Sequence, residues 1–263
     1  MTTPSNTRWD PAQYLKFGDD RLRPGIDLMH RIPSQSPRHI CDLGCGTGAL
    51  TRLLATRWPT ASVVGVDHSA DMLATAAAAP STVEWVESDL CTWQPSTPPD
   101  LIYSNATLHW VEAHETLFPH LLSLLTNGGT LAVQMPLSWG QDSHQLMRQV
   151  MNDRLLGSEA LRLQTARQWV EEPSVYYDLL APLCQQVDLW QTEYTHVLSG
   201  EDPVLEWVQS TGLRPILNGL DDAQRAEFLV DYRARLRQAY PQRADGTTLY
   251  PFRRLFIVAT KAP

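Results

Sequence analysis

The chain has 263 residues, of which 43% are hydrophobic, so it can bury a sizeable core in one large domain or in a domain with insertions. A formal net charge of −8 argues against general affinity for nucleic acid or for an anionic membrane. No apolar run approaches the length of a membrane span, and the start, MTTPSNTRWDP, lacks the features of a secretory signal, so the cytoplasm is the expected location.

The N-terminal part, residues 1–35, is predicted to be a helical segment of a cap over the active site. The stretch from Trp9 to Arg31 is amphipathic, with apolar residues at helical spacing. Pro24 lies in its middle and is expected to break it into two helices, because proline removes a backbone donor and crowds the preceding turn. Residues 33–37 are expected to form a linker to the next part of the chain.

Between residues 36 and 136, apolar runs with strand character alternate with segments at helical spacing. Short apolar strands joined by helices predict a mostly parallel sheet with helices on both faces, which is an α/β fold of the Rossmann type. The strands are predicted at 39–43, 62–67, 82–87, 99–104 and 128–135, and the helices at 47–57, 69–79 and 114–126.

Two later apolar runs, within 184–198 and 253–262, have strand character and are predicted to complete the sheet, with the last strand antiparallel. The segments 137–183 and 199–250 are too long for loops. We expect them to be helical insertions that form a cap over the carboxyl ends of the strands, where open α/β sheets bind ligands. In the second insertion, Asp221 is expected to cap a helix.

The stretch from His39 to Thr51, HICDLGCGTGALT, predicts a strand, a glycine-rich turn and the start of a helix. Glycines at such a turn, here Gly44, Gly46 and Gly48, allow a ligand to approach the backbone closely. The helix that follows presents free N–H groups and the positive end of its dipole. The turn is therefore expected to hold an anionic or polar group of a nucleotide-like ligand.

The spacing of this turn fits two patterns. Gly44, Gly46 and Ala49 satisfy G-x-G-x-x-A, the fingerprint of dinucleotide binding, which leaves an NAD-dependent oxidoreductase as an alternative. The same turn led by Asp42 satisfies D-x-G-x-G-x-G. A carboxylate at that place would repel a pyrophosphate and attract an ammonium group, which S-adenosylmethionine carries. With this motif the sequence resembles the class I S-adenosylmethionine-dependent methyltransferases.

Acidic residues follow the next two predicted strands as well. Asp67 ends the second strand, where a carboxylate can bind ribose hydroxyls. It can also cap the next helix, although Ser69 is the better candidate for that cap. Asp89 follows the third strand and can accept a hydrogen bond from an adenine amino group, or simply shape a turn. The resemblance implies that Asp42, Asp67 and Asp89 hold the methionine end, the ribose and the adenine. The adenine pocket would be completed by His68, Met72 and the backbone of Leu90.

The fourth strand ends in DLIYSNATLHWV. Asn105 and Ala106 are expected where the sheet edge meets the methyl donor. His109 follows and is either a general base or a packing histidine. The four cysteines form no CxxC pair; Cys41 and Cys45 are interpreted as small packing residues, and no metal site is predicted.

The resemblance extends to a narrower family. The segments WDPAQYLKFGDDRLRP, QMPLSW, WVQSTGLRP and RRLFIVA together resemble the trans-aconitate methyltransferases, and they span most of the chain. Members of that family esterify one carboxylate of trans-aconitate, a tricarboxylate, with the methyl group of S-adenosylmethionine. The resemblance implies that this chain does the same.

A carboxylate acceptor, with a reference pKa of about 4, is ionised at neutral pH and needs no general base. A trianion approaching a chain of charge −8 needs local arginines, which pair with carboxylates in bidentate fashion. We expect at least two of Arg21, Arg23, Arg214 and Arg254 to converge on it, with the pocket closed by Tyr14, Trp139, Tyr176, Tyr177 and Tyr250.

Two further alternatives remain at this point. The chain could be a methyltransferase of the same fold that acts on another small molecule with His109 as base. It could also bind S-adenosylmethionine without catalysis. A small molecule is the expected partner in the main interpretation, and the chain is expected to be a monomer or a weak homodimer.

Overall fold

The computed structural model describes residues 18–33, 36–209 and 211–263, with no description of the side chains of residues 18–21. The predicted helix over residues 9–17 and the candidate Tyr14 lie outside the described residues, as does the side chain of Arg21. The contacts divide the described chain into two compact units. We call them the sheet unit (Gly18–Pro136, Trp169–Thr192 and Arg254–Pro263) and the insertion unit (Leu137–Gln168 and Glu193–Arg253).

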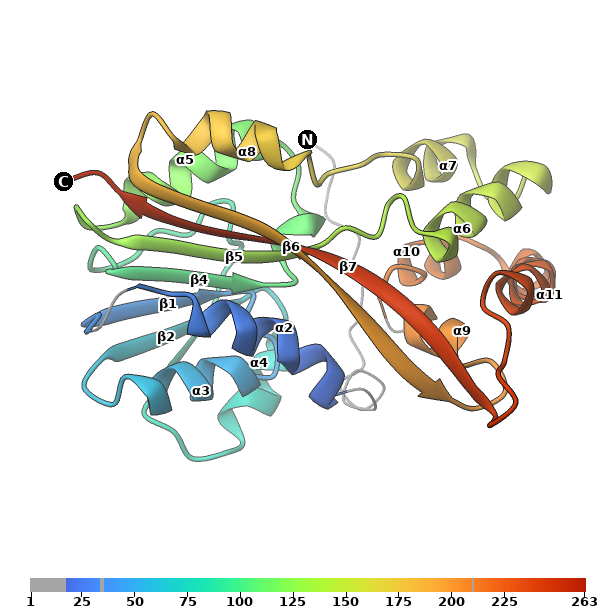
Figure 1. Cartoon of the computed structure of the whole chain (residues 1–263), viewed down its shortest axis with the longest axis horizontal. Coiled ribbons are helices and arrows are strands. Elements are labelled where there is room, and N and C mark those ends of the chain that lie inside the picture. Colours follow the sequence, from blue (N-terminus) through green and yellow to red (C-terminus); the bar gives the residue numbers. More distant parts are fainter. Residues whose placement is uncertain (1–17, 34–35, 210) are drawn as a thin grey trace. The chain divides into compact units, whose positions relative to one another are not determined.

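The sheet has seven strands in the order β3-β2-β1-β4-β5-β7-β6 (Figure 1). The first four neighbour pairs are parallel, and β5 pairs antiparallel with β7. This arrangement confirms the predicted mostly parallel sheet with an antiparallel end. The strands are β1 His39–Leu43, β2 Ser62–Asp67, β3 Glu84–Glu87, β4 Leu101–Asn105, β5 Thr130–Pro136, β6 Cys184–Ser199 and β7 Thr247–Lys261.

Burial of the central strands explains why most of their residues are apolar. Every residue of β5 is buried, and four of the five residues of β1 are buried as well. A parallel sheet needs cover on both faces. The helices that belong to the sheet unit are α2 Gly18–His30, α3 Ala49–Arg57, α4 Ala70–Ala77, α5 His114–Leu124 and α8 Pro173–Leu180, with a 3₁₀ turn η1 at Leu108–Trp110.

The prediction that Pro24 breaks the first helical segment is wrong. Helix α2 runs from Gly18 to His30 with Pro24 inside it. Tertiary contacts hold this helix together: the Tyr103 hydroxyl donates to the Gly25 carbonyl at 2.8 Å, and Leu28 is fully buried. Packing of an apolar helix face can outweigh the local cost of a proline.

The insertion unit contains α6 Asp142–Asp153, α7 Glu159–Thr165, α9 Pro203–Gln209, α10 Arg214–Asn218 and α11 Asp222–Ala239, together with parts of β6 and β7. Its core includes the fully buried aromatic side chains of Trp207, Phe228, Tyr232 and Tyr250. Asp221 is the N-cap of α11, as predicted, because its carboxylate accepts from the Gln224 N–H at 2.8 Å.

The boundaries of the insertions differ from the sequence prediction in two respects, and the first is that β7 begins at Thr247, inside the segment 199–250 that was predicted to be helical. Residues 137–183 were expected to belong to one helical cap, but α8 lies in the sheet unit and packs against α5. The buried Tyr176 hydroxyl on α8 lies 2.6 Å from Nδ1 of His114, at the start of α5. Aromatic contacts among Tyr176, His114 and Phe118 support the same packing. The position of the insertions over the sheet remains a prediction.

Candidate functional site

The glycine-rich turn follows β1, and its three glycines serve different purposes. Gly44, Gly46 and Gly48 have φ angles of +77°, +54° and +74°, in the left-handed region that side chains resist. A Cβ on Gly44 would overlap the Thr107 side chain, and one on Gly48 would overlap Trp85. A Cβ on Gly46 would meet nothing within 4 Å. Gly46 therefore lies where a ligand can reach the backbone, while its two neighbours are required by packing.

The turn after β4 contacts the glycine-rich turn through the side chain of Thr107. The Thr107 hydroxyl lies 3.2 Å from both the Gly44 and the Asn105 carbonyl oxygens and can donate to either. Ala106 has a φ of +53°, an uncommon conformation for a residue with a side chain, and its N–H donates to the Gln134 carbonyl at 2.9 Å. Strained backbone of this kind clusters at functional sites. Thr107 was not among the predicted residues.

The carboxylate of Asp67, at the end of β2, accepts a hydrogen bond from the glycine-rich turn. Its Oδ2 accepts from the Gly46 N–H at 2.8 Å, and its Oδ1 accepts from the Ser69 N–H at 2.9 Å. Ser69 rather than Asp67 caps α4, as expected, because its hydroxyl accepts from the Met72 N–H at 3.3 Å. His68 is exposed beside Asp67, with Nδ1 3.6 Å from Oδ1, whereas Met72 is buried. Binding of ribose by Asp67 stays a prediction.

Asp42 is more deeply placed than the sequence suggested. Its side chain is 2% exposed, and Oδ2 accepts a hydrogen bond of 2.6 Å from the Thr51 hydroxyl on α3. Burial raises the pKa of Asp42 to about 7, although the Thr51 bond lowers it and the nearby Asp67 raises it. Its contact with a ligand ammonium group stays a prediction, and a positive ligand charge would favour the ionised form.

The raised pKa of Asp42 predicts a pH dependence of stability. Between about pH 4 and pH 7 the folded chain keeps a proton that the unfolded chain has released, because the folded pKa is about 7 and the ordinary value is 3.8. The free energy of unfolding should therefore fall with rising pH in this window, by up to about 1.4 kcal/mol per unit from this group. Urea unfolding of wild type and Asp42→Asn at pH 5, 6, 7 and 8 measures it.

The difference in stability between wild type and Asp42→Asn isolates this carboxyl group from histidines that titrate in the same range. The free energy of unfolding of wild type minus that of Asp42→Asn should fall as the pH rises to about 7 and then level off. Asp178→Asn, on the exposed face of α8, is the matched control for the substitution itself. A constant difference for Asp42→Asn would contradict the raised pKa.

Asp89 lies in the turn after β3 and is exposed. Its Oδ1 accepts from the Cys91 N–H at 2.9 Å, which is the turn role weighed from the sequence. Its neighbour Leu90 is half-buried. A hydrogen bond from adenine to Asp89 therefore remains a prediction.

A row of buried polar groups crosses the carboxyl ends of β4, β5 and the adjacent part of β7. Asn105 on β4 pairs in register with Gln134 on β5, and Arg254 on β7 pairs with Pro136. The Gln134 side chain is fully buried, and Arg254 is 5% exposed, with Nη1 3.4 Å from Gln134 Oε1. The Oδ1 atom of Asn105 and the Nε2 atom of Gln134 are buried without a hydrogen-bond partner in the part of the chain that the structure describes.

This row carries donors and acceptors that the fold itself does not use, which is unusual because buried polar atoms are nearly always paired. Gln134 is a residue that the sequence interpretation missed. A signal was present, since it is the one amide in the otherwise apolar strand TLAVQMP. Such a residue in a fully buried strand is expected to bind something at the strand end.

His109 lies on η1 next to Trp110, with ring centroids 4.7 Å apart, and its side chain is half-buried. These contacts fit the packing role that was weighed against general base. Cys41 and Cys45 are buried, and burial raises the pKa of both thiols, which agrees with small packing residues. Among the described residues, no group of three or more His, Cys, Asp or Glu side chains could hold a metal ion.

The predicted acceptor-binding residues fall in both units. In the sheet unit, Arg23 is exposed on α2, Tyr177 is exposed on α8, and Arg254 belongs to the buried polar row. In the insertion unit, Arg214 begins α10, and Trp139 lies before α6. Convergence of these arginines stays a prediction. Tyr176 and Tyr250 are both fully buried, and their part in closing the acceptor pocket stays a prediction.

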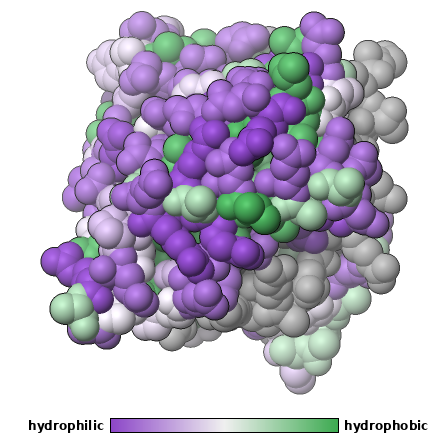
Figure 2. Space-filling model, turned by 90° about the vertical axis from the view of Figure 1, so that its right-hand side faces the viewer, coloured by the Kyte–Doolittle hydropathy of each residue, from purple (hydrophilic) through white to green (hydrophobic). Residues whose placement is uncertain are grey.

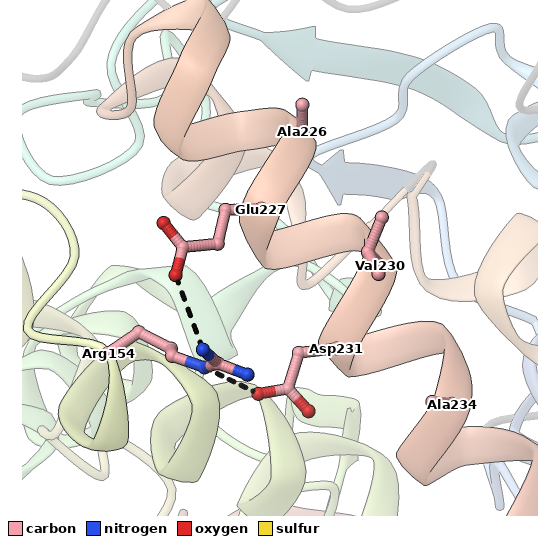
Figure 3. Close-up of a pocket in the computed structure, with 6 residues that line it drawn as sticks. All are labelled: Arg154, Ala226, Glu227, Val230, Asp231 and Ala234. Carbon is pink, nitrogen blue, oxygen red and sulfur yellow. Dashed lines mark hydrogen bonds and ion pairs between the residues drawn. The ribbon is translucent and has the colours of Figure 1, made fainter.

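A surface hollow of about 570 Å³ lies along α11 in the insertion unit and contains none of the predicted residues (Figure 3). Arg154 lies at its edge between two carboxylates, 3.0 Å from Asp231 and 3.5 Å from Glu227, so its charge is already balanced. Figure 2 shows a face on which hydrophilic residues prevail and apolar residues form only small groups. None of the described helices is long and apolar enough to cross a membrane.

Comparison with known sequences gives close matches over nearly the whole chain. Residues 40–129 match a family model described as a methyltransferase domain. The chain is 46% identical over 256 residues to trans-aconitate 2-methyltransferase of Azoarcus sp. (strain BH72), covering 96% of this chain and 99% of that protein. It is 45% identical over 253 residues to the protein of the same name from Klebsiella pneumoniae (strain 342), covering 96% and 98%.

Solved structures share the fold at low identity. A Haemonchus contortus phosphoethanolamine N-methyltransferase 2 in complex with S-adenosyl-L-methionine aligns with a TM-score of 0.54 and 15% identity, over 92% of this chain and 53% of that one. The YcgJ protein of Bacillus subtilis aligns with a TM-score of 0.57 and 10% identity, over 92% and 99%. The seven-stranded sheet is therefore the class I methyltransferase fold that the motif predicted.

Proposed function

Because the chain belongs to the trans-aconitate 2-methyltransferase family, we propose that it transfers the methyl group of S-adenosylmethionine to one carboxylate of trans-aconitate. The products are a monomethyl ester and S-adenosylhomocysteine. The observation that carries the acceptor assignment within the molecule is the buried Arg254 beside Gln134 and Asn105 at the strand ends. A guanidinium group in that place supplies the paired donors that a carboxylate needs.

The methyl donor would be held by residues of the sheet unit that lie around the glycine-rich turn. The open backbone at Gly46 admits the ligand, and Asp67, which binds the Gly46 N–H, has further acceptor capacity for ribose hydroxyls. Asp42, buried near the end of β1, would supply a negative charge beside the turn in its ionised form. The pattern favours a ligand with a positive group and disfavours a pyrophosphate, which counts against a nicotinamide dinucleotide.

The chemistry needs little from the protein beyond placement. A carboxylate oxygen forms a bond to the methyl carbon while the bond from carbon to sulfur breaks, and the sulfonium becomes a neutral thioether. No proton moves, since the acceptor is ionised at neutral pH. The chain must hold the oxygen about 3 Å from the methyl carbon in line with sulfur, and exclude water. We expect Asn105 and Gln134, which pair in register on β4 and β5, to orient the acceptor.

The direct experiment incubates the protein with S-adenosylmethionine labelled in the methyl group and a panel of di- and tricarboxylates. We expect label in a base-labile ester of trans-aconitate. Label in a product stable to mild base, or no label with any carboxylate, would contradict the proposal. A pH–rate profile of His109→Gln tests the alternative with a histidine base: an inflection that this variant alone removes would favour it. The titration of Asp42 near pH 7 makes that variant necessary.

We expect the protein to act in the cytoplasm, where both substrates would be available to it. A monomer or a weak homodimer is expected to carry the activity. Light scattering of the purified protein over a range of concentrations measures the second.

A further inference from the structure

The hydroxyl of Thr51, in the first turn of α3, makes an unusual hydrogen bond for a threonine in a helix. On α3 and α4, the Thr56 and Thr75 hydroxyls donate to the carbonyl four residues earlier, at 2.9 Å and 3.0 Å. This local bond is the common one for a helical threonine. The Thr51 hydroxyl donates instead to Oδ2 of Asp42 on β1, at 2.6 Å. A separation this short lies in the range of a hydroxyl that donates to a carboxylate.

Burial gives a second reason to assign Thr51 a role beyond packing. The buried residues of α3 are Leu50, Thr51 and Leu54, and Thr51 is fully buried. A valine has a similar branched shape and would suit an apolar helix face. A buried hydroxyl is expected where a partner uses it. Asp42 is such a partner, because no other group of the described chain donates to its carboxylate or forms an ion pair with it.

The neighbouring strands do not stabilise a charge on Asp42. On β2, the negative charge of Asp67 opposes ionisation of Asp42. On β4, Tyr103 pairs in register with Asp42, and burial raises the pKa of Tyr103 well above its usual range, so this group is neutral. The Tyr103 hydroxyl donates to the Gly25 carbonyl of α2 and not to Asp42.

The groups next to Asp42 along the chain do not stabilise its charge either. Burial raises the pKa of Cys41 and Cys45, so both thiols are neutral. The Arg52 guanidinium, on α3, donates to the carbonyls of Ala76 and Thr47. The Thr51 hydroxyl is therefore the contact that favours the ionised form of Asp42, and it lowers the pKa of that carboxyl group against the effect of burial.

Asp42 also lies beside the open part of the glycine-rich turn. The Asp67 carboxylate, whose charge acts on Asp42, accepts from the Gly46 N–H at 2.8 Å. A Cβ on Gly46 would meet nothing within 4 Å. While Thr51 holds Oδ2 of Asp42, no described residue donates a hydrogen bond to Oδ1. A carboxylate with one oxygen held and the other available is suited to a ligand that carries an ammonium group.

We infer that Thr51 is a positioning residue for the methyl donor: its hydroxyl holds Oδ2 of Asp42, keeps Oδ1 available to the ammonium group of S-adenosylmethionine, and favours the ionised carboxylate. Thr51 acts through Asp42 and does not itself contact the ligand. The inference rests on the donor site of the proposed function and not on its acceptor. When the ammonium group binds, the proton that Asp42 holds near neutral pH passes to the buffer.

The test compares Thr51→Val, which removes the hydroxyl and keeps the branched shape, with Thr51→Ser, which keeps the hydroxyl. Thr56→Val is the matched control, because it removes a hydroxyl from an exposed position of the same helix. Thermal unfolding shows that each variant is folded at the assay temperature. Two ligands are titrated: S-adenosylhomocysteine carries the same ammonium group as the donor, and 5′-methylthioadenosine lacks the amino-acid end.

Calorimetry at pH 7 should show that Thr51→Val binds S-adenosylhomocysteine about tenfold more weakly than wild type and binds 5′-methylthioadenosine equally well. Thr51→Ser should restore most of the affinity, and Thr56→Val should match wild type. Equal weakening of both ligands in Thr51→Val would mean that Thr51 only supports the fold of the turn, and would overturn the inference. Unchanged affinity for both ligands would overturn it as well.

Titrations in buffers of different ionisation enthalpy count the protons released when S-adenosylhomocysteine binds. In wild type, the release from Asp42 should fall from close to one proton at pH 6 to close to zero at pH 8, with a midpoint at about pH 7. Asp42→Asn, measured in parallel, should lack this component. In Thr51→Val the midpoint should lie at higher pH, because the bond that favours the ionised form is gone. An unchanged midpoint would contradict the inference.

None of these titrations contains trans-aconitate, so the inference can fail separately from the proposed reaction. If wild type binds S-adenosylhomocysteine and Thr51→Val behaves identically, the role of Thr51 is withdrawn and methyl transfer to the carboxylate is unaffected. If the variants differ as expected but no carboxylate is methylated, the proposed reaction is contradicted and the role of Thr51 is kept.

Discussion

A Gly46→Ala variant is expected to stay folded and to lose S-adenosylmethionine affinity by about 10- to 100-fold. The added methyl group meets no protein atom within 4 Å, so it projects into the space through which the ligand would reach the turn. The φ angle of +54° adds strain of about 1 kcal/mol to the folded state. Calorimetric titration with S-adenosylmethionine gives the affinity, and thermal unfolding gives the cost in stability.

Gly128→Ala is the matched control for this variant. Gly128 has a φ of +73° and also has no atom within 4 Å of an added Cβ, but it lies in the turn between α5 and β5. It should show a similar loss of stability with unchanged affinity. If the two variants bind S-adenosylmethionine equally well, Gly46 is not at the ligand. By contrast, Gly44→Ala should unfold the turn, since its methyl group would overlap Thr107.

Replacement of Arg254 by methionine is expected to lower kcat/KM for trans-aconitate by about 100-fold or more, because a desolvated guanidinium that pairs with a carboxylate contributes several kcal/mol. S-adenosylmethionine affinity should change little. Steady-state kinetics with both substrates varied separates the two effects. Arg254 is 5% exposed and contacts Gln134, so thermal unfolding must show that the variant is folded under assay conditions.

Arg253→Met provides the comparison. Adjacent residues of a strand point to opposite faces, and Arg253 is exposed with Glu193 4.0 Å away. Its removal should leave kcat/KM near the wild-type value. Comparable losses in the two variants would point to a general effect of positive charge on β7, and the assignment of Arg254 to the acceptor would then be withdrawn. Recovery of activity in Arg254→Lys to a few per cent would show that charge alone is insufficient.

Local sequence patterns were enough to predict most of the helices and strands of the sheet unit. Strands β1 and β2 have the predicted limits, because short apolar runs between glycine and proline signals have few alternatives. The helix N-caps Asp221 and Ser69 could be predicted as well, because an N-cap involves residues only three apart in the chain. The glycine-rich turn could be recognised, but the different roles of Gly44, Gly46 and Gly48 depend on Thr107 and Trp85, which are distant in the chain.

Nonlocal contacts decided the rest. Helix α2 continues through Pro24 because it packs on the sheet and Tyr103 hydrogen-bonds to it. Helix α8 belongs to the sheet unit because Tyr176 contacts His114 on α5. The amino-acid sequence by itself determined the order of strands and helices, the cofactor motif and the family, since these follow from neighbouring residues and their spacing. Only the tertiary structure decided which buried polar atoms of the described residues lack a hydrogen-bond partner, as at Asn105 and Gln134. Burial and pairing are properties of residues brought together from distant parts of the chain, and no local pattern encodes them.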